Sequence, residues 1–106
     1  MNHNYIEKHT ADYSQQLMES LSDKAQAVAY LEVALEEYEL DQDANAFMLA
    51  LKNVVQAQGG VGELSKKTGL DRAHLYRVFS RQGNPRFLTL NNILRALGFR
   101  LSIGLA

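Results

Sequence analysis

The sequence of 106 residues has no cysteine, no tryptophan and a single proline. Without cysteine the chain can form neither a disulfide framework nor a thiolate metal site. It also has no apolar run that approaches membrane-spanning length, so we expect no membrane segment, no signal peptide and a cytoplasmic protein. Hydrophobic residues still make up 46% of the chain. That fraction is enough for one compact core, and we expect a single domain.

Basic residues are scarce in the first half of the chain, and acidic residues are scarce in the second half. Residues 1–58 contain three basic and ten acidic residues, whereas residues 59–106 contain eight basic and two acidic residues. A basic half suits a polyanion such as nucleic acid. An acidic half suits a basic partner, or it simply keeps the protein soluble. Each charged run could also be no more than a solvated face.

Residues that enzymes use are few. His3 and His9 lie in the N-terminal segment, and His74 is far along the chain. No metal-ligand spacing occurs, and the glycine-rich run 59–62 lacks the lysine and the serine or threonine of a phosphate-binding loop. We therefore expect no catalysis, no metal and no cofactor.

The apolar spacing of the chain is typical of helices. Residues 1–22 have only scattered apolar positions, and we expect a loosely ordered segment there with at most a short helix near 11–20. Residues 23–106 then form the domain, with helices predicted over about 23–39, 44–57, 61–68, 71–79 and 90–97. The expected N-caps are Ser22 or Asp23, Asp41 or Asp43, Asp71, and Thr89.

Two of these helices have clear apolar stripes. The helix over 23–39 is expected to turn inward the residues Val28, Leu31, Leu35 and Tyr38. The helix over 44–57 is expected to bury Phe47, Leu51, Val54 and Val55.

Residues 61–80 predict a helix-turn-helix. Gly69 stands where the chain leaves the first helix and turns sharply, a conformation that glycine tolerates best. Asp71 can cap the second helix, which would then present Arg72, His74, Tyr76 and Arg77 outward. A helix rimmed with arginine is shaped to enter the major groove of DNA.

The segment Phe99–Ile103 alternates apolar and polar residues, which predicts a strand. A lone strand is not stable, and nothing else in the chain has a strand pattern. Either this segment pairs with its copy in a second subunit across a two-fold axis, or it packs its three apolar side chains on the core.

From about residue 29 to residue 103 the chain resembles the probable addiction module antidote proteins. These are antitoxins of toxin–antitoxin operons, within the larger class of lambda repressor-like (XRE/HigA-like) helix-turn-helix regulators. The resemblance is carried by YLEVALEE (30–37), TGLDRAHLYR (68–77), GNPRF (83–87) and LRALGFRLS (94–102). The chain departs from the family in a longer linker, YELDQD (38–43), and in Ser65, where alanine is usual.

The resemblance implies an all-α, five-helix repressor-like bundle with a helix-turn-helix, to which we add the C-terminal strand. It also implies a homodimer that binds a pseudo-palindromic operator in its own promoter, and a basic toxin partner of the RelE/ParE-like type. Two alternatives stay open. One is a phage-type or general repressor with no toxin partner, and the other is a helix-turn-helix used only for protein contacts.

Repressors of this class read bases from the start of the second helix and from one turn later, which corresponds here to Arg72, Ala73 and Arg77. Arginine can bond guanine through two parallel hydrogen bonds, and alanine can meet a thymine methyl group. His74 and Tyr76 are further candidates for contact with DNA. Alternatively, Tyr76 lies half-buried and His74 is an ordinary exposed histidine.

Two further sets of charged and polar residues are candidates for binding. The candidates for phosphate contacts, which position a protein without reading sequence, are Lys66, Lys67, Arg81, Asn84 and Arg86. The candidates for contact with a basic toxin are Glu32, Glu36, Glu37 and Glu39, which could equally be the wet face of an amphipathic helix.

Overall fold

The computed structural model describes residues 3–80 and 84–106, with side chains from residue 12 onward within these ranges. These residues form six α-helices and no strand. The helices are α1 (His3–Leu21), α2 (Lys24–Asp41), α3 (Ala44–Ala57), α4 (Gly60–Thr68), α5 (Arg72–Val78) and α6 (Phe87–Ala96). The all-α class expected from the sequence is confirmed, with one helix more than the five expected.

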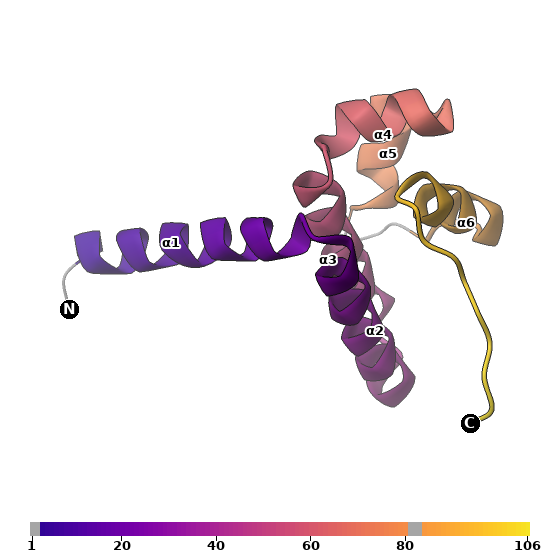
Figure 1. The fold of residues 1–106 in the computed structure, drawn as a ribbon, viewed down its shortest axis with the longest axis horizontal. Helices are drawn as coiled ribbons and strands as arrows, with labels where there is room; N and C mark the ends of the chain where they lie inside the picture. Colours follow the sequence, from indigo (N-terminus) through magenta and orange to yellow (C-terminus); the bar gives the residue numbers. More distant parts are fainter. Residues whose placement is uncertain (1–2, 81–83) are drawn as a thin grey trace.

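The additional helix is α1, which is longer than the short helix expected near 11–20. In Figure 1 it projects from the bundle, and only its C-terminal end reaches the other helices. There Leu21 is buried, and Leu17 and Met18 pack against the core. The side-chain amide of Gln58 donates to the carbonyl of Leu21 at 2.7 Å, which satisfies a carbonyl that the helix end leaves without a partner. The last turns of α1 are thereby fixed to the end of α3.

Three N-caps, Asp23, Asp43 and Asp71, are those expected from the sequence. Asp23 accepts a hydrogen bond from the N–H of Gln26 at 3.0 Å, and Asp43 accepts one from Asn45 at 3.0 Å. Because α2 continues to Asp41, only Gln42 and Asp43 separate it from α3. The linker is therefore shorter than the run YELDQD suggested.

The start of α6 differs from the prediction. The helix begins at Phe87, so Thr89 lies inside it and does not cap it. Arg86 occupies the N-cap position without a side-chain capping bond. In the first turn of α6 the apolar residues Phe87 and Leu88 face solvent. The apolar pattern of the sequence therefore does not mark where this helix begins.

The core is centred on α3, whose expected apolar face is confirmed. Leu51 and Val54 are wholly buried, and Phe47 and Val55 are nearly so. α2 packs against α3, but not through the whole stripe that was expected. Leu31 is buried, whereas Val28 and Leu35 are 37% and 41% exposed.

The face of α2 that packs inward is rotated toward small residues. Ala27 is wholly buried, and Tyr30 and Ala34 pack against the core. Alanine lets two helix backbones approach closely, so this face lies against α3 and the bulkier Val28 and Leu35 are left at its flank. A hydrogen bond of 3.1 Å from the amide of Asn53 to the hydroxyl of Tyr30 joins the two helices.

The C-terminal tail, residues 98–106, follows α6 and has no regular secondary structure. The strand predicted over Phe99–Ile103 is therefore absent from this part of the described chain, for the reason that a lone strand has no ladder to join. The tail is attached at its beginning. Lys24 donates to the carbonyl of Leu97 at 2.6 Å and lies 5.6 Å from the centre of the Phe99 ring. Beyond this point the tail extends away from α6 (Figure 1).

No helix in the described ranges is both long and apolar enough to cross a membrane.

Candidate functional site

α4 and α5 are joined by a tight turn that the sequence specifies residue by residue. Gly69 has φ of +77°, and its N–H donates to the carbonyl of Ser65 at 2.9 Å. The hydroxyl of Ser65 donates to the carbonyl of Leu70 at 2.6 Å. Serine at this position, where the resembling proteins usually have alanine, therefore supplies a hydrogen bond across the turn. Asp71 then caps α5 by accepting from the N–H of His74 at 2.7 Å, as expected.

α5 has one buried face and one exposed face. Leu75 is wholly buried and Val78 is 7% exposed, so these two side chains anchor the helix to the core. Arg72, Ala73 and Arg77 are exposed on the other side. Tyr76 is 57% exposed, so it is mostly solvated rather than enclosed.

The structure brings four of the candidate DNA-contacting residues around one cavity of about 470 Å³. His74 and Arg77 line it from α5, and Asn84 and Arg86 line it from the segment that leads into α6. Arg77 and Arg86 therefore border the same cavity from two different segments of the chain. Thr89 also lines this cavity. It was predicted to cap α6, but α6 begins at Phe87, which places Thr89 within the helix and beside the cavity.

Arg72 lies elsewhere, against α4. A Cβ atom added to Gly62 would come within 2.8 Å of Nη2 of Arg72. The guanidinium therefore lies over Gly62, where the absence of a side chain leaves room for it. To reach a base from the start of α5, this side chain would have to swing away from Gly62.

Two further basic candidates, Lys66 and Lys67, do not line this cavity. Lys66 and Lys67 are exposed in the last turn of α4, where positive charge also complements the partial negative charge of a helix C-terminus. Lys67 lines a separate small pocket beside the end of α6. Arg81 lies outside the described residues, and its proposed phosphate contact stays a prediction.

The four glutamates proposed for a toxin are all exposed on α2. Glu36, Glu37 and Glu39 belong to its outer surface, and Glu32 lines a second, larger cavity of about 790 Å³. That cavity also includes Arg95 and Arg100, two residues to which the sequence had assigned no role. Among the side chains that the structure describes, no group of three or more histidines, cysteines or carboxylates could hold a metal ion.

The described chain is thus an all-α protein with a basic hollow between α5 and α6 and an acidic surface on α2. A family profile described as probable addiction module antidote protein matches residues 11–105. The chain belongs to this family. No curated protein and no solved structure matches it significantly.

Proposed function

We propose that this protein is an antitoxin that binds the operator of its own operon as a homodimer and neutralises a basic toxin. Membership of the antidote family supports the antitoxin role. The observation that carries the DNA-binding role is the cavity at which His74, Arg77, Asn84 and Arg86 meet. It lies beside a short exposed helix in the basic half of the chain, as a helix-turn-helix regulator requires.

In this proposal α5 enters the major groove. Arg77 reads guanine, and Ala73 contacts a thymine methyl group. His74 and Tyr76 lie close enough in sequence to touch the same groove. Phosphates beside the groove are contacted from the segment before α6 by Arg81, Asn84 and Arg86. Further phosphate contacts come from α4, through Lys66 and Lys67. Two copies related by a two-fold axis would place their α5 helices about 34 Å apart, one turn of B-DNA, and so match a pseudo-palindrome.

Arg72 has two positions in this proposal. In the free protein its guanidinium rests on Gly62. On DNA it leaves α4 and reaches a base or a phosphate near the start of α5. Arg77 needs no such movement, so we assign the main base contact to Arg77.

Replacing Arg86 with alanine is expected to weaken binding to all DNA sequences alike. The substitution removes a charge beside the cavity but no helix cap, because the Arg86 side chain makes no capping bond. The slope of log affinity against log salt concentration should become shallower by about one. Titrations of wild type and variant on operator and scrambled DNA measure both effects. A loss confined to one base pair of the operator would contradict a phosphate role.

The toxin-binding role is assigned to the acidic surface of α2. Opposite charge on two partners speeds their encounter and hinders wrong partners. A small basic toxin of the RelE/ParE-like type would meet Glu36, Glu37 and Glu39 there. Because these side chains are exposed, their contribution should depend strongly on salt.

The toxin role is tested with the product of the adjacent gene. Co-expression with this protein should relieve the growth arrest that the adjacent gene causes alone. The double substitution Glu36→Lys with Glu39→Lys should slow association by about tenfold or more at low salt, and much less at high salt. If the double variant associated with the toxin as fast as the wild type at both salt concentrations, the acidic surface would be rejected as the docking site. If the wild-type protein failed to relieve the growth arrest, the adjacent gene product would not be its toxin. The protein would then be interpreted as a repressor without that partner.

A further inference from the structure

Gly62 lies inside α4 at a position where the backbone does not require glycine. Gly60, which begins α4, and Gly69, which follows its end, have positive φ values that glycine tolerates best, whereas Gly62 does not. Inside a helix, glycine is less favourable than alanine because it loses more conformational freedom on folding. Alanine at position 62 would make α4 itself more stable, so the local structure of the helix gives no reason for glycine.

The close contact at Gly62 is with the side chain of Arg72. A Cβ atom added to Gly62 would lie 2.8 Å from Nη2, 3.2 Å from Cζ and 3.6 Å from Nε of Arg72. These three nearest atoms all belong to the guanidinium group, which is the free end of a flexible side chain. α4 and α5 pack against each other (Figure 1), yet none of the three atoms belongs to the backbone of either helix. Alanine at position 62 would therefore displace the guanidinium and leave the packing of the two helices unchanged.

The position of Arg72 over Gly62 is one from which DNA can draw it away. Gly62 is the third residue of α4, in the turn where the free amides of a helix carry a partial positive charge. A guanidinium gains no attraction from that charge. Arg72 is itself exposed, so a phosphate or a base edge of DNA can reach it from solvent. The contact with Gly62 thus competes with DNA for Arg72 but does not block it.

We propose that Gly62 lowers the affinity of this protein for its operator by holding Arg72 over α4 in the free protein. In the proposed function, Arg72 binds DNA only after it leaves this position. A conformation that cannot bind lowers the apparent affinity in proportion to its population. An occupancy of about 70–90% for the position over Gly62 would lower the affinity about three- to tenfold at each half-site. The inference rests on the proposed function and adds to it a residue that is not itself assigned to contact DNA.

A double-mutant cycle on operator DNA tests the role of Gly62. Gly62→Ala should bind the operator about three- to tenfold more tightly at each half-site than the wild type, because Arg72 is released from α4. In chains that carry Arg72→Ala, the same substitution should leave affinity unchanged. That second pair is the matched control, since alanine stabilises α4 in both backgrounds and should raise both melting temperatures by a few degrees.

The cycle also separates the two kinds of contact that Arg72 can make. A gain on operator DNA alone assigns the released Arg72 to a base, whereas an equal gain on scrambled DNA assigns it to a phosphate. If Gly62→Ala changes affinity equally in the two backgrounds, the residues are not coupled and the inference is overturned. Weaker binding by Gly62→Ala than by the wild type would overturn it as well.

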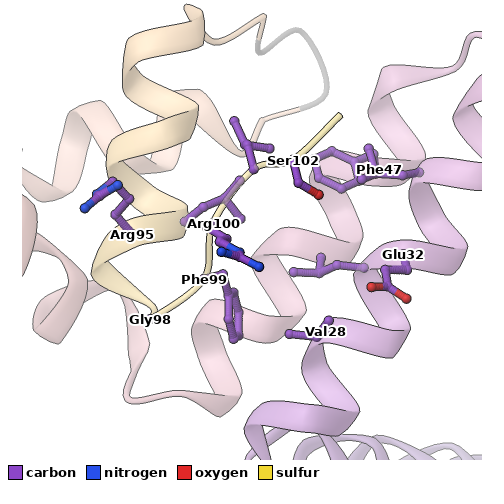
Figure 2. Close-up of a pocket in the computed structure, with 12 residues that line it drawn as sticks. Val28, Glu32, Phe47, Arg95, Gly98, Phe99, Arg100 and Ser102 are labelled. Atoms are coloured by element: carbon purple, nitrogen blue, oxygen red, sulfur yellow. The ribbon is translucent and has the colours of Figure 1, made fainter. Parts of the chain in front are cut away.

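A second measurement needs no DNA. Nitrogen-15 relaxation of the arginine Nε–H groups reports their motion on the picosecond to nanosecond timescale. The Arg72 group should be more ordered in the free wild type than in Gly62→Ala. Arg95, which borders the larger cavity beside α2 (Figure 2), is the internal control and should not change. Equal mobility of Arg72 in the two proteins would contradict the contact with Gly62.

These results distinguish failure of the inference from failure of the proposed function. If the wild type binds its operator specifically but Gly62 and Arg72 show no coupling, only the role of Gly62 is rejected. If the wild type shows no specific binding, the proposed function is rejected, and the role of Gly62 in affinity is rejected with it.

Discussion

Replacing Arg77 with alanine is expected to abolish the preference for guanine at one base pair of each operator half-site. A bidentate contact between arginine and guanine contributes about 1–3 kcal/mol of discrimination, or about 5- to 150-fold in relative affinity. Arg77 is exposed at the end of α5 and lines the cavity with Arg86. Its loss should therefore leave the fold intact. Competition titrations with single-base variants of the operator measure the preference.

The matched control for this substitution is Arg95→Ala. Both arginines stand in the last turn of a helix, both are exposed, and both substitutions remove one positive charge. Arg95 lines the other cavity, so its loss should lower affinity little and leave every base preference unchanged. If Arg77→Ala discriminates between bases as the wild type does, Arg77 on α5 does not read the operator as we propose.

Replacing Leu75 with alanine is expected to lower the free energy of unfolding by about 2–5 kcal/mol. Leu75 is wholly buried and, with Val78, anchors α5 to the core. α5 has seven residues, far fewer than an isolated helix needs to be stable in water. Its structure therefore depends on this packing. Because domains of this size are stable by only about 5–15 kcal/mol, this loss should markedly lower the urea midpoint and the melting temperature of the variant.

Urea denaturation followed by circular dichroism measures this effect, and Tyr76→Ala is the control. Tyr76 neighbours Leu75 in the same helix but is 57% exposed, so its substitution should change stability by less than about 1 kcal/mol. Operator binding by Leu75→Ala should fall with the folded fraction and recover on cooling toward the temperature of maximum stability. Equal midpoints for the two variants would contradict the assignment of Leu75 to the core.

The helices around α3 could be predicted because their ends are marked by local chemistry. Asp43 and Asp71 cap α3 and α5, and Gly69 ends α4 with a positive φ. Each of these signals acts over three or four residues, so the sequence alone contains it. The bounds of α3 agree with the prediction for the same reason.

The inward face of α2 could not be predicted from the same kind of signal. Apolar bulk favoured Val28 and Leu35, whereas the structure uses Ala27 and Ala34. Which of two adjacent apolar stripes packs inward depends on how closely α3 approaches, and that is a tertiary property. The strand predicted over residues 99–103 is absent for a related reason. Its alternating pattern fits a strand, but a strand needs a neighbouring strand to pair with, and the described part of the single chain offers none.

The candidate site was partly predictable. The sequence predicted a base contact for Arg77 and phosphate contacts for Asn84 and Arg86, and the fold places these three residues around one cavity. It gave no hint that Arg72 would lie on Gly62, because that contact depends on how α4 and α5 cross. The role of each residue in binding DNA stays a prediction.

The measurement that tests the central claim most directly is a titration of the purified wild-type protein on DNA from upstream of its own gene. The titration is repeated with a scrambled competitor over a series of salt concentrations. We expect a tight complex with the upstream fragment that the competitor does not displace, and an affinity that falls steeply as salt rises, because phosphate contacts release counterions. Equal affinity for upstream and scrambled DNA at every salt concentration would contradict the account.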